Sequence, residues 1–484
     1  MPIKFLQPLP ILIIIFYIEL NSYKAHAQLI TFGRPHYQAE VKTTLASQRA
    51  PFWLYANTFG TVSTTAPNAL FNVSLYSPTS DSLLPNWRNI NVNYGVETYL
   101  STHKNGTETF LVEGYTSIKY GIFRILAGRK REVIGLIGDS LLTSGSFAMS
   151  GNTLPIPQIK LTSNFVVPFT NKLIAIKACF SYGWLGSMAV GYGGQGVTSV
   201  NGLFHQKNLY ATIGKPQSRF QATIGFNHQV QWGGENQIWP NGLSPTEAWW
   251  GVVLGKSWMG SRVGNHLGTI DMGLKWKLQQ GELFLYRQNI YEDGSLYAFL
   301  NIGDGLNGVV YRPVQQSENA FSVKSMLFEF LNTTSQGGDV FNLSTGVFGK
   351  DNYFNHYVYT NGWSYNRKTI GTPFIAPQSD LNSRWPHLKN SLTNNNRVKL
   401  LHLGASGQYL DCHWFLKTSF SINYGLYDYP LIGNPKQFSS ILQVQKSLSW
   451  LGGIEWSTAL GIDVGRLYKS SVAIQLGLRK RGNF

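Results

Sequence analysis

Aromatic side chains that alternate with cations are the residues of this chain best suited to chemistry. Aromatic ring faces stack on the C–H surfaces of sugars, and arginine and lysine side chains hold carboxylates and phosphates. One stretch of this kind lies within residues 353–368 and another within residues 384–389. The same residue types also form membrane-interface girdles and solvated loops, so both interpretations stay open. The polysaccharide-binding candidates are Tyr353, Tyr357, Trp363, Tyr365, Arg367, Lys368, Arg384, Trp385, His387 and Lys389.

Catalytic motifs are present only as fragments. Residues 138–141 read Gly-Asp-Ser-Leu, which matches the nucleophile block of a lipase and esterase family. That block needs a base from a downstream Asp-x-x-His, and none occurs near the C-terminus, so the serine lacks the partner that would activate it. The ten histidines are scattered, and there is no His-Glu-x-x-His motif. We therefore expect no enzyme activity, no metal site and no cofactor.

Strands must position the candidate residues, because period-2 patterns recur through most of the chain. Apolar residues recur at alternate positions over 90–100, 220–232, 270–278 and 454–464, and several such runs carry tryptophan or tyrosine at an end. These runs are longer than the ~5–6 residues usual for soluble sandwiches. Only 13% of the residues are charged, against about 25% in typical soluble domains. The sequence predicts an all-β fold, a transmembrane antiparallel β-barrel.

The C-terminal segment indicates a Gram-negative outer membrane. Val472, Ile474, Leu476 and Leu478 share one parity, and the chain ends on Phe484. A strand with lipid on one side and a polar lumen on the other alternates in this way, and a terminal aromatic residue resembles the assembly signal of outer-membrane barrels. The opposite parity predicts a set of side chains that face the lumen: Glu455, Asp463, Gln475 and Arg479.

The N-terminal part of the chain divides into two expected segments before the barrel. Lys4, an apolar run and a small-x-small motif indicate a secretory signal peptide over residues 1–27, cleaved on export. Residues 28–89 alternate poorly, and we expect a short helix over 37–49 within a segment that plugs or abuts the barrel at its periplasmic side. A loose N-terminal extension is the alternative. The barrel itself is expected over residues 90–484.

Counting strands backward from Phe484 orients the expected barrel. The terminal residue should lie at the periplasmic side, so the Gly452-Gly453 turn is also expected there. Barrels of this class have short periplasmic turns and longer outer loops. The segments 429–437, 465–470 and 371–397 are then external, and the last of them carries four of the binding candidates.

The charge balance limits the partners. The formal net charge is +16, which suits anionic polysaccharide or the phosphates of lipopolysaccharide. Basic residues placed beside anionic lipid head groups explain the same balance equally well. An exported protein is not expected to meet nucleic acid. Cys179 and Cys412 lie far apart in the sequence, and whether they pair stays open.

Long irregular blocks of the chain carry a family resemblance. They lie at 51–60 (PFWLYANTFG), 127–159, 285–309, 327–338 and 349–374 (GKDNYFNHYVYTNGWSYNRKTIGTPF). These blocks resemble the Wzi capsule assembly family. The resemblance implies a monomeric outer-membrane barrel of about 18 strands (16–20), inserted by the barrel assembly machinery. It also implies a lectin-like role in attaching or organising capsular polysaccharide at the cell surface.

Three functions follow from these observations. The first is a lectin-like outer-membrane protein that binds and helps to assemble or anchor capsular or other anionic polysaccharide, in contact with membrane lipid and lipopolysaccharide. The alternative is a porin or substrate-specific outer-membrane channel. The third, and the least supported, is an outer-membrane lipid-modifying enzyme.

Overall fold

A computed structural model gives the structure of most of the chain. The signal peptide expected over residues 1–27 lies outside the described residues. The residues that the structure describes are 29–78, 86–167, 170–191, 196–258, 261–292, 301–314, 320–342 and 347–484.

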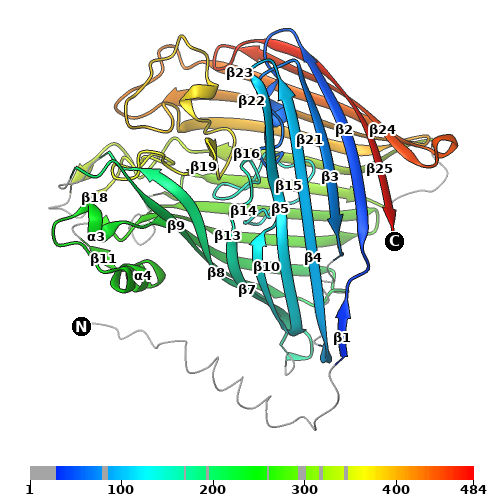
Figure 1. Ribbon diagram of the computed structural model, residues 1–484, viewed down its shortest axis with the longest axis horizontal. Coiled ribbons are helices and arrows are strands. Elements are labelled where there is room, and N and C mark those ends of the chain that lie inside the picture. The colour runs from blue at the N-terminus through cyan, green and yellow to red at the C-terminus, as the bar shows by residue number, and fades with distance from the viewer. Residues whose placement is uncertain are drawn as a thin grey trace.

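The chain forms a closed barrel of 18 antiparallel strands, as the sequence predicts (Figure 1). Each strand pairs with its sequence neighbour, and β2 pairs with β25 to close the ring. A short strand, β1 (Leu29–Phe32), adds to β4 in parallel. The wall strands are β2 (His36–Ala46), β3 (Asn68–Tyr76), β4 (Asn86–His103), β5 (Gly106–Gly121), β6 (Phe123–Arg129), β7 (Gln158–Val166), β8 (Ile174–Ala189), β9 (Ser199–Ile213), β10 (Phe220–Trp232), β13 (Asn265–Leu278), β14 (Gly281–Tyr291), β15 (Gly305–Pro313), β16 (Phe321–Asn332), β21 (Arg397–Tyr409), β22 (Cys412–Gly425), β23 (Lys436–Leu448), β24 (Ile454–Gly465) and β25 (Ser471–Asn483).

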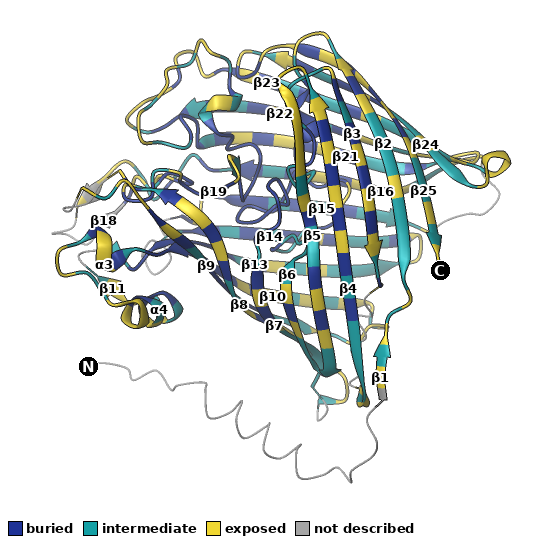
Figure 2. Cartoon of the chain, viewed as in Figure 1, coloured by how far each residue is buried: buried dark blue, intermediate teal, exposed yellow. Residues whose placement is uncertain are grey.

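The outer face of the wall is apolar, which is what a lipid environment requires. On β25 the side chains of Val472, Ile474, Leu476 and Leu478 are between 41% and 48% exposed, whereas Gln475 between them is buried. The predicted parity of this strand is therefore confirmed. Figure 2 shows the same alternation of exposed and buried residues along most strands.

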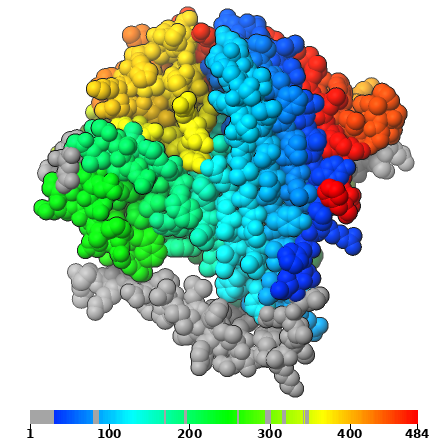
Figure 3. Space-filling model, in the orientation of Figure 1, coloured from blue at the N-terminus to red at the C-terminus, as the bar shows by residue number. Residues whose placement is uncertain are grey.

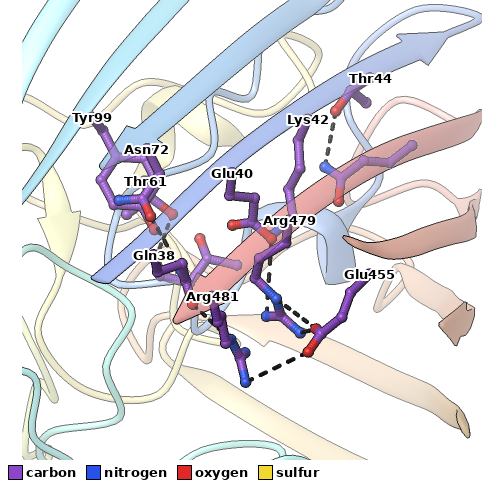
Figure 4. Close-up of polar contacts among 12 residues, drawn as sticks. Gln38, Glu40, Lys42, Thr44, Thr61, Asn72, Tyr99, Glu455, Arg479 and Arg481 are labelled. Carbon is purple, nitrogen blue, oxygen red and sulfur yellow. Dashed lines mark hydrogen bonds and ion pairs between the residues drawn. The ribbon is translucent and has the colours of Figure 1, made fainter. Parts of the chain in front are cut away.

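The seam between β2, β25 and β24 is lined on its inner side by polar pairs (Figure 4). Arg479 donates to Glu455 through Nε at 2.8 Å, and Gln475 donates to Thr44 at 2.9 Å. Arg481 donates to Gln38 at 3.0 Å. The predicted inward orientation of Gln475, Arg479 and Glu455 is thus confirmed, and their pairing satisfies polar groups that lipid could not.

The N-terminal boundary differs from the prediction. Residues 36–46 form β2, a wall strand, and not a helix, so the barrel begins at residue 36 rather than 90. The alternation of β2 is weak because Ala39 and Thr43 are the small residues on its outer face. Polar Gln38, Glu40 and Lys42 face the lumen, so the apolar contrast that marks β25 is absent from β2.

The two ends of the barrel differ in the length of their connections. We call the end with the terminal Phe484 and the short turns 279–280, 410–411 and 449–453 the turn end. The other end, the loop end, carries the long connections 47–67, 130–157, 233–264 and 333–396. Segment 371–397 connects strands at the loop end, since Arg397 pairs with Gly425 at the end of β22. That this end is external stays a prediction.

Three of the long connections fold back into the lumen and fill it. We call residues 47–67, 130–157 and 349–396 together the plug. They join inward wall residues in one large apolar cluster, visible as buried loops inside the barrel in Figure 2. The largest fully buried plug side chains are Trp363, Tyr353, Phe52, Phe147 and Phe354.

Polar side chains on the inner wall hold the plug by its backbone. A buried N–H without a partner is costly, so each irregular plug segment needs acceptors from outside itself. The wall supplies them from four strands: Asp271 accepts from Leu136 N at 2.7 Å, Gln288 from Phe147 N at 2.9 Å, Glu329 from Ser144 N at 2.6 Å and Asp463 from Phe52 N at 2.9 Å.

The wall is incomplete near the loop end between β5 and β8. β6 pairs with β5 only over Gly114–Tyr120, and β7 pairs with β8 only as far as Gly183. The exposed edge of β8 is covered by the plug, because Thr360 N donates to Ala189 O at 3.0 Å and Gly191 N donates to Val358 O at 3.0 Å. Plug residues thus stand in for a wall strand at this edge.

Cys179 and Cys412 are both free thiols. Among the described residues, no helix is long and apolar enough to cross a bilayer.

Candidate functional site

Three aromatic candidates are buried inside the plug. Tyr353, Trp363 and Tyr365 are 0%, 1% and 8% exposed. Tyr353 donates its hydroxyl to Asp304 at 3.0 Å, and Trp363 donates Nε1–H to Ala148 O at 2.8 Å. Their ring faces are covered by neighbouring side chains, so they pack the plug and present no surface to a polysaccharide. This corrects their assignment as binding residues.

The two cations beside them have different environments. Lys368 pairs with Asp380 at 2.9 Å, and its ammonium also lies 5.2 Å from the centre of the Tyr55 ring. The contact with Tyr55 joins two plug segments, 349–396 and 47–67. Arg367 is exposed, at a turn with a positive φ of 62°. Only Arg367 of the two therefore faces solvent.

The 384–389 stretch lies on the loop-end surface. Trp385 is half-buried, and its Nε1–H donates to Arg466 O at 3.0 Å. Arg384, His387 and Lys389 are exposed. The tryptophan anchors this loop to the β24–β25 connection, which leaves the three basic residues at the surface.

Tyr357 is the predicted aromatic residue that reaches a surface hollow. Its side chain is 59% exposed and lines a cleft of about 270 Å³ between the 233–264 connection and the plug. Figure 3 shows the green surface of the 233–264 connection and the yellow surface of the plug on the same face of the molecule. The residues that line this aromatic cleft are Glu235, Trp239, Trp258, Arg262, Gly264, His356, Tyr357, Val358 and Tyr359.

The aromatic rings that line the cleft pack against one another in pairs. Trp239 and Trp258 meet edge to face, with centroids 6.0 Å apart and planes at 84°. On the opposite wall His356 stacks on Tyr359 at 5.3 Å and lies 4.8 Å from Tyr357. Edge-to-face and offset contacts are the favoured geometries for such rings, so the aromatic residues of each wall are packed together before any ligand binds.

A buried carboxylate joins the two sides of the aromatic cleft. Glu235, the first residue of α3 (Glu235–Ile238), accepts from Gly233 N at 2.9 Å and from the Tyr359 hydroxyl at 3.0 Å. Burial raises the pKa of Glu235, because the charged form loses its hydration there. Burial also lowers the pKa of His356 to about 4, so this ring is neutral near pH 7.

Helix α4 (Pro245–Leu254) supports the cleft from the outer face of the wall. Ser244 caps it in a reciprocal capping box with Glu247, and Gly255 ends it in the left-handed conformation. Its buried residues pack on Val230 and Trp232, which have the outward parity of β10. A second hollow of about 350 Å³ lies beside it and shares one wall with the aromatic cleft, Trp258, which belongs to the β11 (Ser257–Trp258) and β12 (Ser261–Arg262) hairpin.

The arrangement suits binding rather than bond making. Arg262 donates to Gly255 O from the cleft rim, and the lining combines aromatic faces, one guanidinium and one carboxylate. In the Gly-Asp-Ser-Leu block, Asp139 Oδ1 accepts from Leu141 N at 3.0 Å and Leu142 N at 3.2 Å, which is a turn-stabilising role. Among the described residues, no cluster of three or more histidine, cysteine or acidic side chains could hold a metal ion.

Sequence reasoning missed most of the aromatic cleft. Trp239, Trp258 and Arg262 were not among the candidates, although four of the 14 tryptophans lie between residues 239 and 258. That density is the signal that could have found them. The partner wall at 356–359 is about a hundred residues away in the chain, and only the fold brings it near.

Comparison with known proteins gives matches in fold only. No protein-family model and no curated protein sequence matches the chain. The structure of OccK5 (OpdH) from Pseudomonas aeruginosa aligns with a TM-score of 0.49 at 9% identity, over 95% of this chain and 100% of that one. OccAB4 from Acinetobacter baumannii aligns at 0.48 and 7%, over 93% and 98%. The outer membrane protein opdK from P. aeruginosa aligns at 0.45 and 8%, over 93% and 99%. Likeness at this level carries no argument about function.

Proposed function

We propose that this outer-membrane barrel is a surface protein that binds an anionic exopolysaccharide at its loop end and helps to assemble or anchor it there, without catalysis. This is the role that the resemblance to the Wzi capsule assembly family implies. The observation that carries the proposal is the aromatic cleft, because Trp239, Trp258 and Tyr357 line it together with Arg262. Ring faces hold sugar C–H surfaces, and a guanidinium fork holds a carboxylate.

The charge of the loop end supports an acidic glycan. Arg384, His387 and Lys389 are exposed there, and Arg367 lies in the same plug segment. Exposed cations raise the local concentration of a polyanion before any specific contact forms. The cleft would then fix individual sugar rings, while the cations draw the chain in.

The filled lumen supports a surface role over free diffusion of solutes. Trp363 and Tyr353 pack the centre of the plug, and Glu329 holds two of its donors. A general porin needs a continuous water path, and a plug fixed by buried hydrogen bonds opposes one. A substrate-specific channel stays the second candidate. The observation that favours it is a cavity inside the barrel, between β5 and β8, whose lining includes six lysine and arginine side chains.

A binding measurement tests the proposal. Wild-type protein in detergent should bind an immobilised uronic-acid polymer, and Trp239→Ala with Trp258→Ala should weaken binding by roughly three- to tenfold per ring. Trp450→Ala is the matched control, since Trp450 is 77% exposed at the turn end. Equal binding by the cleft variant and the control, with normal folding, would contradict the proposal.

Conductance separates the two candidates. In planar bilayers a surface lectin with this plug should show little steady conductance. Large, stable, ohmic openings of the wild-type protein would favour the channel instead.

A further inference from the structure

A third hollow, separate from the aromatic cleft and from the hollow beside α4, lies inside the barrel toward the turn end. Its volume is about 210 Å³, and β5, β6, β7, β8 and the first residues of plug segment 130–157 line it. Lys119 lies two residues before the end of β5, Arg124 is the second residue of β6 and Lys177 is the fourth residue of β8. These positions place one side of the cavity near the turn end of the barrel, whereas the aromatic cleft belongs to the loop end.

Cations dominate the lining of this cavity. The lining includes one carboxylate, Glu132, and six cationic side chains: Lys119, Arg124, Lys130, Arg131, Lys160 and Lys177. The lining of the cavity therefore carries more positive than negative side chains. Low-dielectric walls that carry one sign of charge focus the field into a cleft.

The wall pattern shows that these cations serve the lumen and not the lipid. Ile125, beside Arg124, is 55% exposed on the outer face, and Ile159 and Leu161, on either side of Lys160, are 53% and 44% exposed. Alternate residues of a strand point to opposite faces, so Arg124 and Lys160 point inward. Contact with lipid head groups on the outer surface does not explain them.

The plug fixes the inner side of the cavity. Arg131 pairs with Glu97 at 2.8 Å and donates to the Tyr99 hydroxyl at 2.9 Å, while its backbone N–H donates to Glu113 at 2.7 Å. Lys130 lies 4.7 Å from the centre of the Tyr115 ring. These contacts hold the plug cations in place before a ligand arrives.

Acidic side chains of the protein neutralise part of the positive charge of the lining. Glu132 pairs with Lys160, a side chain that is only 6% exposed. Glu97, just outside the lining, pairs with Arg131. The lining contains four further cationic side chains, on Lys119, Arg124, Lys130 and Lys177. Thr162 and Asn164, which share the inward parity of Lys160, add neutral hydrogen-bond donors.

We propose that this cavity is a binding site for an oxyanion, a carboxylate or phosphate group of a ligand that enters the barrel from the turn end. Lysines and arginines hold such groups by charge-assisted hydrogen bonds, and a cavity of this size accepts one small anionic group such as a sugar acid or a phosphate. The site is separate from the aromatic cleft, so it does not depend on glycan binding at the loop end.

Calorimetric titration of the folded, detergent-solubilised barrel tests the site. Inorganic phosphate and glucuronate are the probes, one for each oxyanion. Both the wild-type protein and a triple variant, Lys119→Gln/Arg124→Gln/Lys177→Gln, are titrated. The variant should lose at least about tenfold in affinity, because it removes several charge-assisted contacts. Tighter binding of one probe identifies the preferred oxyanion.

A matched variant controls for net charge. Lys104→Gln/Lys215→Gln/Lys469→Gln also removes three charges, all from exposed positions away from the cavity, and should bind as the wild type does. Binding lost equally in both triple variants would show general electrostatics and overturn the site. Saturable binding of neither probe by the wild type would overturn it as well.

A protection measurement needs no variant and so does not depend on variant folding. A water-soluble amine-reactive reagent is applied to the wild-type barrel, and the modified lysines are quantified by mass spectrometry. The better-bound probe should slow modification of Lys119 and Lys177, and leave Lys104 unchanged. Unchanged modification of all three at saturating probe would contradict the proposal.

Discussion

The plug and the aromatic cleft contain the same types of aromatic residue, but the plug buries them and the cleft leaves them partly exposed. In the plug, Trp363 and Tyr353 are fully buried, and both polar groups have protein partners. In the aromatic cleft, Tyr357 is more than half exposed and the two tryptophans are partly so. Tyr353 and Tyr357 are only four residues apart. Local composition therefore does not decide whether an aromatic residue packs or binds. The difference comes from distant acceptors that the fold brings near, Asp304 for Tyr353 and Ala148 O for Trp363.

Removing a plug tryptophan should have the largest effect. Trp363→Ala leaves a large cavity and should lower the free energy of unfolding by about 3–5 kcal/mol. Trp250→Ala, at a 47% exposed position on α4, should change it by at most about 0.5 kcal/mol. Urea unfolding in detergent, with electrophoretic mobility before and after heating, measures both. Similar values for the two variants would break the distinction between plug and surface.

Breaking a wall acceptor should have the next largest effect. Glu329 accepts from Thr143 at 2.7 Å, from Ser144 N at 2.6 Å and from the Tyr286 hydroxyl. Glu329→Ala leaves these buried donors without a partner and should cost about 2–4 kcal/mol.

The same variant tests whether the plug closes the lumen. Glu329→Ala should raise single-channel conductance in planar bilayers, whereas Glu329→Gln, which keeps one acceptor oxygen, should do so less. Unchanged conductance and stability in Glu329→Ala would mean that the plug is held without the wall.

Surface cations of the loop end should have a smaller effect, on binding only. Arg384→Gln with Lys389→Gln should weaken binding of an anionic polysaccharide by roughly two- to fivefold, and added salt should reduce the difference. Trp385→Ala should instead loosen the loop, because its Nε1–H holds Arg466 O. Capsule retention on cells, with barrel levels as the control, measures both. Normal retention in every variant would assign glycan contact to the aromatic cleft alone.

The smallest expected effect is a pH dependence at Glu235. Its raised pKa means that the folded protein favours the neutral carboxyl, so stability falls as pH rises from the ordinary value of 4.5 through the folded-state pKa. Glu235→Gln imitates the neutral form and should be more stable than wild type at neutral pH. The difference should shrink as the pH falls toward 4.5. Parallel thermal melts across this range would show it, and a constant difference would contradict the assignment.

Apolar contrast explains which parts of the fold were predictable. β25 was predictable because Ile474 and Leu476 alternate with small or polar residues, and the structure confirms its parity. β2 was missed because Ala39 and Thr43 give its outer face little contrast with its inner one. An alternating pattern reveals a strand, and which of its faces meets the lipid, only where one face is strongly apolar.

The candidate site was harder to predict because it depends on long-range contacts. Trp363 is buried where its Nε1–H donates to Ala148 O, more than two hundred residues earlier in the chain. The aromatic cleft forms only because Trp239 and Tyr357, on different connections, lie close together in the fold. Neither pairing leaves a trace in the local sequence. The exposed basic residues of 384–389 were predictable in kind, since charged loop residues are rarely buried.

The edge of β8 has a consequence for how this protein reaches the membrane. Because Thr360 and Val358 bond to Ala189 and Gly191, a strand edge that lipid could not solvate is sealed by residues from inside the barrel. The lumen segment and the wall must therefore mature together during insertion. A chain without residues 349–396 would leave an unsealed edge, open to pairing with another copy.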